Sequence, residues 1–290
     1  MNYQKLYQEG CGILEAAGVE EAKLDARLLL EAVCGTTYND LLVHGDRLPD
    51  SEQAARYREC IGQRAEHIPL QHITGTQEFM GLSFRVNEKV LIPRQDTEIL
   101  VEEVLRELHD GMRILDLCTG SGCILISLLR YSNDCEGVGV DISKEALQVA
   151  CENARLILGR ELSEGENGGQ FCGCGITFLE SDLFSKVEGK FDRIVSNPPY
   201  IRSEVIQTLM PEVREHEPLL ALDGKEDGLF FYRRIVDESR SFLCGGGSLY
   251  LEIGYDQAKE VRTLMEEAGF AGIHVVKDYA GLDRVVYGTL

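Results

Sequence analysis

The sequence predicts an α/β protein in which a small helical domain precedes a doubly wound parallel sheet. In about the first 73 residues, apolar side chains recur at spacings of three and four, which is typical of helices. From residue 112 onward, short apolar runs alternate with longer amphipathic segments. That alternation is typical of a parallel sheet with helices on both faces. The 290 residues are enough for one large domain and one small one.

The helical domain is expected to occupy residues 1–73. Its helices are expected over residues 2–17, 22–34 and 50–67. Asp50 follows a proline and suits a helix start, whereas Gly18 and Gly35 lie where helices would end. No residue pattern in this domain points to chemistry, and we expect the domain to serve substrate recognition.

A β-hairpin is expected to link the two domains, over residues 74–92. Alternating side chains on either side of Met80 and Gly81 predict its two strands. A helix should follow to about residue 109, with Asp96 or Thr97 as its cap. Arg94, just before this helix, is a candidate substrate-binding residue.

The second domain is expected to span residues 93–290. We expect its strands over residues 112–117, 137–141, 176–180, 191–196, 248–253, 273–276 and 284–288, and its helices over 122–131, 143–159, 229–243 and 257–269. Residues 161–175 are rich in Gly, Glu and Ser and predict a surface loop, which contains Gly-Gly-Gln at 168–170. Ligands of doubly wound sheets bind at the carboxyl ends of the strands.

The composition of the chain indicates in which compartment the protein is expected to act and which partners it is expected to bind. The sequence contains no apolar run of the roughly 20 residues that a membrane span needs, and its start has no signal-peptide core, so we expect a cytoplasmic protein and no membrane partner. The ten cysteines have no metal-ligand spacing, so we expect them to be reduced, mostly buried and not bound to metal. A net charge of −20 disfavours direct nucleic-acid binding and suits a basic partner.

A cofactor site is predicted at three successive strand ends. The first is a glycine-containing turn from strand to helix, formed by Cys118, Thr119, Gly120, Ser121 and Gly122. Its glycines allow close approach of a ligand, but Leu125 stands where a dinucleotide fingerprint needs glycine, so NAD is less favoured. Asp141 could accept the ribose hydroxyls of an adenosine. At the third strand end, Asp182 could meet the adenine amino group and Leu183 its face.

The fourth strand ends in Asn197-Pro198-Pro199-Tyr200, which suits methyl transfer to a planar nitrogen. Such a nitrogen is a poor nucleophile, so its positioning matters more than basicity. The Asn197 side-chain oxygen and the Pro198 carbonyl can each accept one N–H and so aim the nitrogen. Tyr200 offers an aromatic face to a flat substrate group and to a sulfonium cation.

These features resemble the Rossmann-like methyltransferases that depend on S-adenosyl-L-methionine. The resemblance narrows to the glutamine N5-methyltransferases of peptide chain release factors, because four further segments match that family: 69–75, 91–98, 217–222 and 280–286. It implies S-adenosyl-L-methionine as cofactor and the Gly-Gly-Gln glutamine of class I release factors as substrate.

The family's site residues carry over onto matching positions. Asn197 and Pro198 would hold the substrate amide, Pro199 and Tyr200 would wall its pocket, and Asn197 would also adjoin the cofactor. By the same analogy, residues 118–122, 141, 182 and 183 would hold the cofactor. Cys118 stands where the family often has glycine, which predicts that its φ is not strongly positive. Gln95 and Leu183 replace a frequent proline and a frequent aromatic residue.

Three alternatives remain on the sequence alone. A DNA adenine or cytosine amino-methyltransferase uses the same four-residue signature, but it would need a basic groove and base-flipping elements. An RNA guanine methyltransferase is disfavoured for the same reason. A regulatory module that binds the cofactor without catalysis would have no use for Asn197 to Tyr200.

Overall fold

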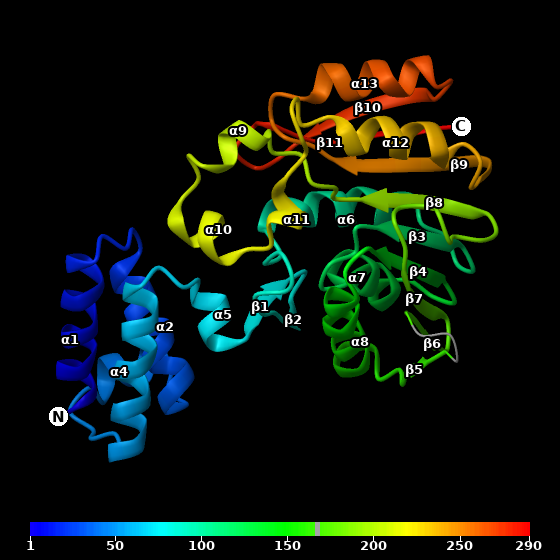
Figure 1. The fold of residues 1–290 in the computed structure, drawn as a ribbon. Helices are drawn as coiled ribbons and strands as arrows, with labels where there is room; N and C mark the ends of the chain where they lie inside the picture. Colours follow the sequence, from blue (N-terminus) through cyan, green and yellow to red (C-terminus); the bar gives the residue numbers. More distant parts are fainter. Residues whose placement is uncertain (166–168) are drawn as a thin grey trace. The chain divides into compact units, whose positions relative to one another are not determined.

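The structure, a computed structural model, describes residues 1–165 and 169–290 (Figure 1). Its contacts divide the chain into two compact units. Met1–Thr76 and Met210–His216 form the first, and Gln77–Leu209 and Glu217–Leu290 form the second. The short segment 210–216 therefore belongs with the N-terminal helices, although it follows the fourth predicted strand in the sequence.

The first unit is helical, as predicted. Its three long helices are α1 (Tyr3–Ala16), α2 (Ala22–Cys34) and α4 (Ser51–Ala65). They enclose a core that includes Leu6, Leu14, Leu30, Tyr57 and Ile61. The sequence did not reveal the short helices α3 (Tyr38–Val43), α5 (Leu70–Thr74) and α10 (Pro211–His216), because five or six residues make too few turns to show a periodicity.

The ends of these helices follow from local chemistry. Asp50 caps α4 in a capping box, in which its side chain accepts from the Gln53 N–H and the Gln53 side chain accepts from the Asp50 N–H. Gly35 ends α2 in the left-handed conformation, and Gly18, with φ 77°, follows the end of α1. The predicted helix start and both predicted helix ends are confirmed.

Asp50→Ala is expected to lower the free energy of unfolding of the helical unit by about 1 kcal/mol, because the N–H of Gln53 loses its side-chain acceptor. Asp50→Ser keeps an acceptor and should cost less. Urea unfolding followed by circular dichroism would measure both variants. Equal losses for alanine and serine would contradict the capping role.

A buried ion pair attaches α10 to the helical unit. The Arg64 side chain donates to Asp25 Oδ2 at 2.7 Å and to Glu212 Oε1 at 3.0 Å, and all three side chains are largely buried. His67 Nδ1 lies 3.0 Å from the same Glu212 oxygen. These contacts explain why residues 210–216 group with helices that precede them by more than a hundred positions.

The hairpin is formed by β1 (Thr76–Phe79) and β2 (Leu82–Arg85), as predicted. Met80 and Gly81 have φ of 52° and 67°, which is the geometry of a tight two-residue hairpin turn. From Gln77 on, the hairpin belongs to the second unit. The Asn153 side chain, on α8 (Lys144–Leu158), bonds both the N–H and the carbonyl of Arg85 and thereby fixes β2 to that helix.

The second unit is built on a nine-stranded sheet of order β10-β11-β9-β8-β3-β4-β7-β6-β5. Its strands are β3 (Arg113–Leu117), β4 (Glu136–Asp141), β5 (Ser163–Glu164), β6 (Gln170–Gly173), β7 (Ile176–Glu180), β8 (Phe191–Ser196), β9 (Leu243–Glu252), β10 (Ala271–Lys277) and β11 (Asp283–Thr289). The five central strands are parallel. At the edges, β11 runs antiparallel to β9 and β10, and β6 runs antiparallel to β7 and β5. The predicted parallel, doubly wound sheet is therefore confirmed in its five central strands, whereas one reversed strand near each edge adds antiparallel pairs that the sequence analysis did not predict.

Two other sequence predictions need correction in this sheet. Residues 161–175 are not simply a loop, because β5 and β6 extend the sheet there; residues 170–173 are too short to show an alternating pattern. Gly168 lies outside the described residues, and Gln170 begins β6. Strand β9 begins at Leu243, before the predicted residue 248, because the glycines at 245–247 continue the strand instead of breaking it.

Helices cover both faces of the sheet, as predicted. They are α6 (Gln95–Glu107), α7 (Cys123–Tyr131), α8, α12 (Phe230–Ser239) and α13 (Ala258–Glu267), with the short α9 (Ser203–Ile206) and α11 (Leu219–Leu222) between β8 and α12. One buried apolar cluster includes side chains of α6, α7 and α8, and a second includes those of α12 and α13. The helices of the described ranges are all too short or too polar to cross a membrane.

The strand order places a ligand site between β3 and β8. The chain runs from β3 outward to β4 and β7 and then returns to β8 on the other side of β3. At such a reversal the connections leave the sheet in opposite directions and open a crevice at the carboxyl ends of the strands. All four predicted motifs lie at the ends of these four strands.

Candidate active site

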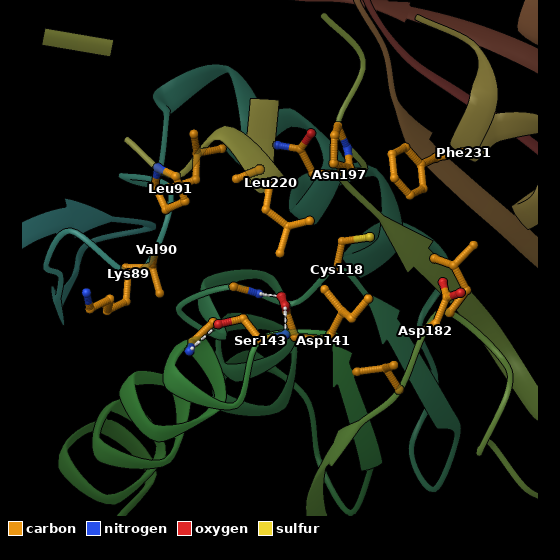
Figure 2. A pocket seen from close by; sticks show the side chains of 18 of the residues that line it. Lys89, Val90, Leu91, Cys118, Asp141, Ser143, Asp182, Asn197, Leu220 and Phe231 are labelled. Carbon is orange, nitrogen blue, oxygen red and sulfur yellow. Dashed lines mark hydrogen bonds between the residues drawn. The ribbon is translucent and has the colours of Figure 1, made fainter. Parts of the chain in front are cut away.

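One cavity joins the four strand ends (Figure 2). Seven of the residues predicted from the sequence line it: Cys118, Gly120, Asp141, Asp182, Leu183, Asn197 and Pro199. Figure 2 shows Asn197 and Asp141 on opposite sides of the cavity, with the Cys118 thiol between them. Side chains from all four strand ends thus line one space.

The turn after β3 is held in an unusual backbone conformation. Cys118 has φ 58°, which lies in the left-handed region that normally favours glycine. The prediction that the φ of this cysteine is not strongly positive was therefore wrong. Gly120 and Gly122 also have positive φ, of 53° and 78°. Such conformations concentrate at ligand sites, where the surrounding structure offsets their cost. Burial raises the pKa of the Cys118 thiol, so this thiol is uncharged near neutral pH.

The interior of the turn is fixed by buried polar groups. Thr119 and Ser121 are buried, and the Thr119 hydroxyl donates to Asp116 Oδ2 at 2.6 Å. A Cβ at Gly122 would lie 2.8 Å from an Ile126 carbon, which shows how closely the helix after the turn packs here. Burial raises the pKa of Asp116 to about 7. These residues shape the turn, while Cys118 and Gly120 face the cavity.

Asp141 ends β4 and links the turn to the start of α8. Its two carboxylate oxygens accept from the Gly120 N–H and the Ser143 N–H, each at 2.9 Å (Figure 2). Burial raises the pKa of Asp141, whereas the hydrogen bonds from these backbone N–H groups lower it. Each oxygen still has a second lone pair, so the carboxylate can accept two further hydrogen bonds from a ligand.

Asp182 and Leu183 occupy the end of β7, at one side of the cavity. Asp182 Oδ1 accepts from Arg234 of α12 at 2.8 Å, and the Asp182 side chain is 52% exposed. The carboxylate is therefore paired at the rim. Leu183 is buried, with φ 47°, and presents an apolar surface.

The Asn-Pro-Pro-Tyr segment is divided between the cavity and the protein interior. Asn197 and Pro199 line the cavity, and Pro198 is buried. The Tyr200 hydroxyl instead donates to Glu252 Oε1 at 3.4 Å, and the aromatic ring that lines the cavity belongs to Phe231. Phe231 and Asn197 both line the cavity (Figure 2).

Residues at the start of α6 support Asn197. The Asn197 amide Nδ2 donates to the Thr97 hydroxyl oxygen at 3.3 Å. The predicted cap by Asp96 or Thr97 was wrong: the N-cap is Arg94, without a side-chain cap. Asp96 instead pairs with Arg284 at 3.2 Å.

Arg94 is committed to an ion pair. Its guanidinium donates to both oxygens of Glu217, at 2.7 and 2.8 Å. The Glu217 side chain is 1% exposed, whereas that of Arg94 is 41% exposed. Arg94 thus anchors the segment that leads into α11, and its outer surface remains accessible.

Sequence reasoning missed several lining residues: Lys89, Val90, Leu91, Val140, Ile142, Ser143, Ala146, Ser181, Pro218, Leu220, Ala221 and Phe231. Those at 89–91 follow the hairpin, and those at 218–221 lie at α11, so both groups are distant in sequence from the strand ends. The segments around residues 91 and 218 did carry part of the family resemblance, which was the available signal.

Two family models match the chain, and two relatives match nearly its whole length. The PrmC N-terminal domain model matches residues 5–75, and the methyltransferase small domain model matches residues 94–214. The release factor glutamine methyltransferase of Agrobacterium fabrum is 40% identical, over 94% of this chain and 92% of its own length. The release factor glutamine methyltransferase of Geobacter sulfurreducens is 41% identical, over 96% of this chain and 93% of its own length.

The solved structure of a methyltransferase from Pyrococcus furiosus is similar in fold. It has a TM-score of 0.50 and 17% identity, and the match covers 83% of this chain and 98% of that one. The likeness shows the Rossmann-like methyltransferase fold that the sequence resemblance implied.

Proposed function

The chain belongs to the release factor glutamine methyltransferases, and from this premise we propose that it methylates the side-chain amide nitrogen of the glutamine in the Gly-Gly-Gln loop of class I release factors. The methyl donor would be S-adenosyl-L-methionine, and the reaction would take place in the cytoplasm. The observation that carries the proposal is the position of Asn197 across one cavity from Asp141.

The residues around Asp141 suit the adenosine part of that cofactor. The carboxylate has free lone pairs for two ribose hydroxyls, and the neighbouring walls are apolar, with Val140, Ala146 and Leu183 among them. Gly120 leaves room for close approach of the backbone. When bound, the cofactor would supply an electrophilic methyl group on a sulfonium.

The proposed part of Asn197 is to hold the nitrogen that receives the methyl group. Its side-chain oxygen would accept one amide N–H and the Pro198 carbonyl the other, with Pro199 as a wall. Aiming the nitrogen in this way supplies the orientation on which attack by a delocalised lone pair depends. The nitrogen held by Asn197 and Pro198 would receive the methyl group that the sulfonium gives up, and the proton that the nitrogen loses would pass to water.

Tyr200 and Arg94 have supporting parts in this proposal. The Tyr200 hydroxyl bonds to Glu252, and this bond fixes the end of the Asn-Pro-Pro-Tyr segment. Arg94 fixes the chain before α11 through Glu217, and its exposed surface is available to a protein substrate.

The proposal is tested by measuring transfer of a radiolabelled methyl group to three substrates in parallel: a class I release factor, duplex DNA and ribosomal RNA. We expect label only in the release factor, and none when its loop glutamine is replaced by alanine. Label in DNA or RNA would instead support a nucleic-acid amino-methyltransferase, which the charge of −20 disfavours.

Raising the salt concentration is expected to slow association with a release factor, while affinity for the small cofactor hardly changes. The negatively charged surface would attract a basic partner over a distance that salt screens. Stopped-flow association rates at low and moderate salt would measure the effect. A rate that does not depend on salt would mean that the charge serves only solubility.

A further inference from the structure

The two proposed acceptors, Asn197 and Pro198, lie in a short segment that is held at both ends. At its start, Ser196 ends β8, which pairs with β3 on one side and with β9 on the other. The Ser196 hydroxyl also donates to the Leu117 carbonyl at 2.8 Å. Two prolines follow Asn197, and their rings restrict φ, so a shift of one end is passed along the segment. The group that holds Tyr200, at the far end, therefore also places Asn197 and Pro198.

The side chain of Gln257 holds this far end. Gln257 is the N-cap residue of α13 and is 4% exposed. Its Nε2 donates to the Tyr200 carbonyl at 3.1 Å and to the Gly228 carbonyl at 3.2 Å. Its Oε1 accepts from the Gly254 N–H at 2.9 Å. Both N–H groups and the oxygen of this buried amide are thus used, and the reversed amide would set its oxygen against two carbonyl oxygens.

The two stretches of backbone that Gln257 joins are in close contact. A Cβ at Gly228 would lie 2.5 Å from the Tyr200 carbonyl oxygen and 2.6 Å from Gln257 Nε2. A Cβ at Gly224 would lie 2.7 Å from the Tyr200 Cα. The Gly224 N–H donates to the Ile201 carbonyl at 2.8 Å. These two glycines thus let the chain pass directly against the end of the Asn-Pro-Pro-Tyr segment.

The chain on either side of the two glycines lines the cavity. Leu220, on α11, precedes them, and Phe231, on α12, follows them; both line the same cavity as Asn197 (Figure 2). Among the described residues, those that line the cavity do not include Gln257, so it acts through the backbone that it holds. We propose that Gln257 is a positioning residue, which keeps Asn197 and Pro198 in place relative to this wall. The inference rests on the function proposed above for those two acceptors.

The first test measures Gln257→Glu and Gln257→Met in single-turnover methylation of a release factor. Glutamate keeps the length and an acceptor but replaces the NH2 group by an oxygen, whereas methionine removes both polar groups. We expect each variant to be about tenfold slower, because the substrate nitrogen is then less well aimed. Affinity for S-adenosylhomocysteine should stay within about twofold, since Asp141 lies across the cavity from Asn197 (Figure 2). A rate within about twofold of the wild type in both variants would overturn the inference.

Tyr232→Phe is the matched control for the loss of a buried hydrogen bond. The Tyr232 hydroxyl donates to the Glu252 carbonyl at 2.8 Å and lies 3.4 Å from Gln257 Oε1. Its removal therefore leaves both donors of Gln257 in place. We expect a lower melting temperature, as in Gln257→Met, but a methylation rate within about twofold of the wild type. A rate that falls as far as in Gln257→Met would show that any lost hydrogen bond in this region slows the reaction, and the positioning role would be wrong.

A second variant disturbs the same contact from the opposite side. The added Cβ of Gly228→Ala would push the Tyr200 carbonyl away from Gln257 Nε2, so this variant should also be about tenfold slower and keep its affinity for S-adenosylhomocysteine. Gly246→Ala controls for the strain of positive φ. Gly246 has φ 80°, and no described atom lies within 4 Å of a Cβ placed there, so its rate should not change.

The double variant decides whether the two changes act on one contact. Because Gly228→Ala and Gln257→Met each break the bond to Tyr200, the second change should cost no more than about twofold once the first is made. Full costs that multiply would mean that the two residues act independently, which contradicts the proposed joint.

The two levels of proposal fail separately. If Asn197→Ala keeps its activity, the proposed function of Asn197 fails. If Asn197→Ala is inactive while both Gln257 variants match the wild type, only the positioning role of Gln257 fails.

Discussion

Asn197→Ala is expected to lower the single-turnover rate of release-factor methylation about 100-fold or more, because one positioning acceptor is then missing from the site. Asn197→Asp should keep partial activity, since a carboxylate still accepts the substrate N–H. The measurement is methyl transfer at saturating cofactor for each variant. An alanine variant within a few fold of the wild type would contradict the positioning mechanism, even though the family assignment would stand.

Cofactor binding is the control for both Asn197 variants. Asn197 lies on the opposite side of the cavity from Asp141, so affinity for S-adenosylhomocysteine should survive either change (Figure 2). Calorimetric titration would measure it. A large loss of affinity would mean that Asn197 acts mainly through the cofactor.

The strand ends were predictable because their signals are local. Asp141 and Asn197 each follow an apolar run of strand composition, and parallel strands bring such ends to one edge. The β-hairpin was predictable for a similar reason, since the residues of its strands alternate around Met80 and Gly81. In each case a few neighbouring residues carry enough information to place the element.

The supporting residues were not predictable in the same way. Thr97 suggested a helix cap, yet its side chain contacts Asn197, a hundred positions further on. Glu252 is a carboxyl in an apolar strand, and the sequence gives no sign that Tyr200 faces it. Such contacts depend on how distant segments pack, so they appear only once the fold is known.

Two further differences have specific physical causes. The left-handed conformation of Cys118 shows that a non-glycine residue tolerates positive φ when the surrounding turn holds it there. Segment 210–216 joins the helical unit through Arg64 and Glu212, a pairing between two charges that nothing in the sequence singles out.

Asp141→Ala is expected to weaken binding of S-adenosylhomocysteine by about 2 to 5 kcal/mol, because two charge-assisted hydrogen bonds to the ribose are lost. The Gly120 and Ser143 N–H groups also lose their acceptor in this variant, so the turn itself contributes a second cause of weaker binding.

A ligand that lacks the ribose hydroxyls separates these two causes. The 2′,3′-dideoxy analogue of S-adenosylhomocysteine should bind the wild type far more weakly than the parent compound does. In Asp141→Ala the two ligands should bind with nearly equal affinity, because the acceptor that distinguishes them is gone. Calorimetric titration of both ligands against both proteins would measure the four affinities that this comparison needs. Thermal unfolding would check that the variant is folded. If the variant still discriminates between the ligands as strongly as the wild type, Asp141 does not hold the ribose, and its carboxylate serves only to fix the turn.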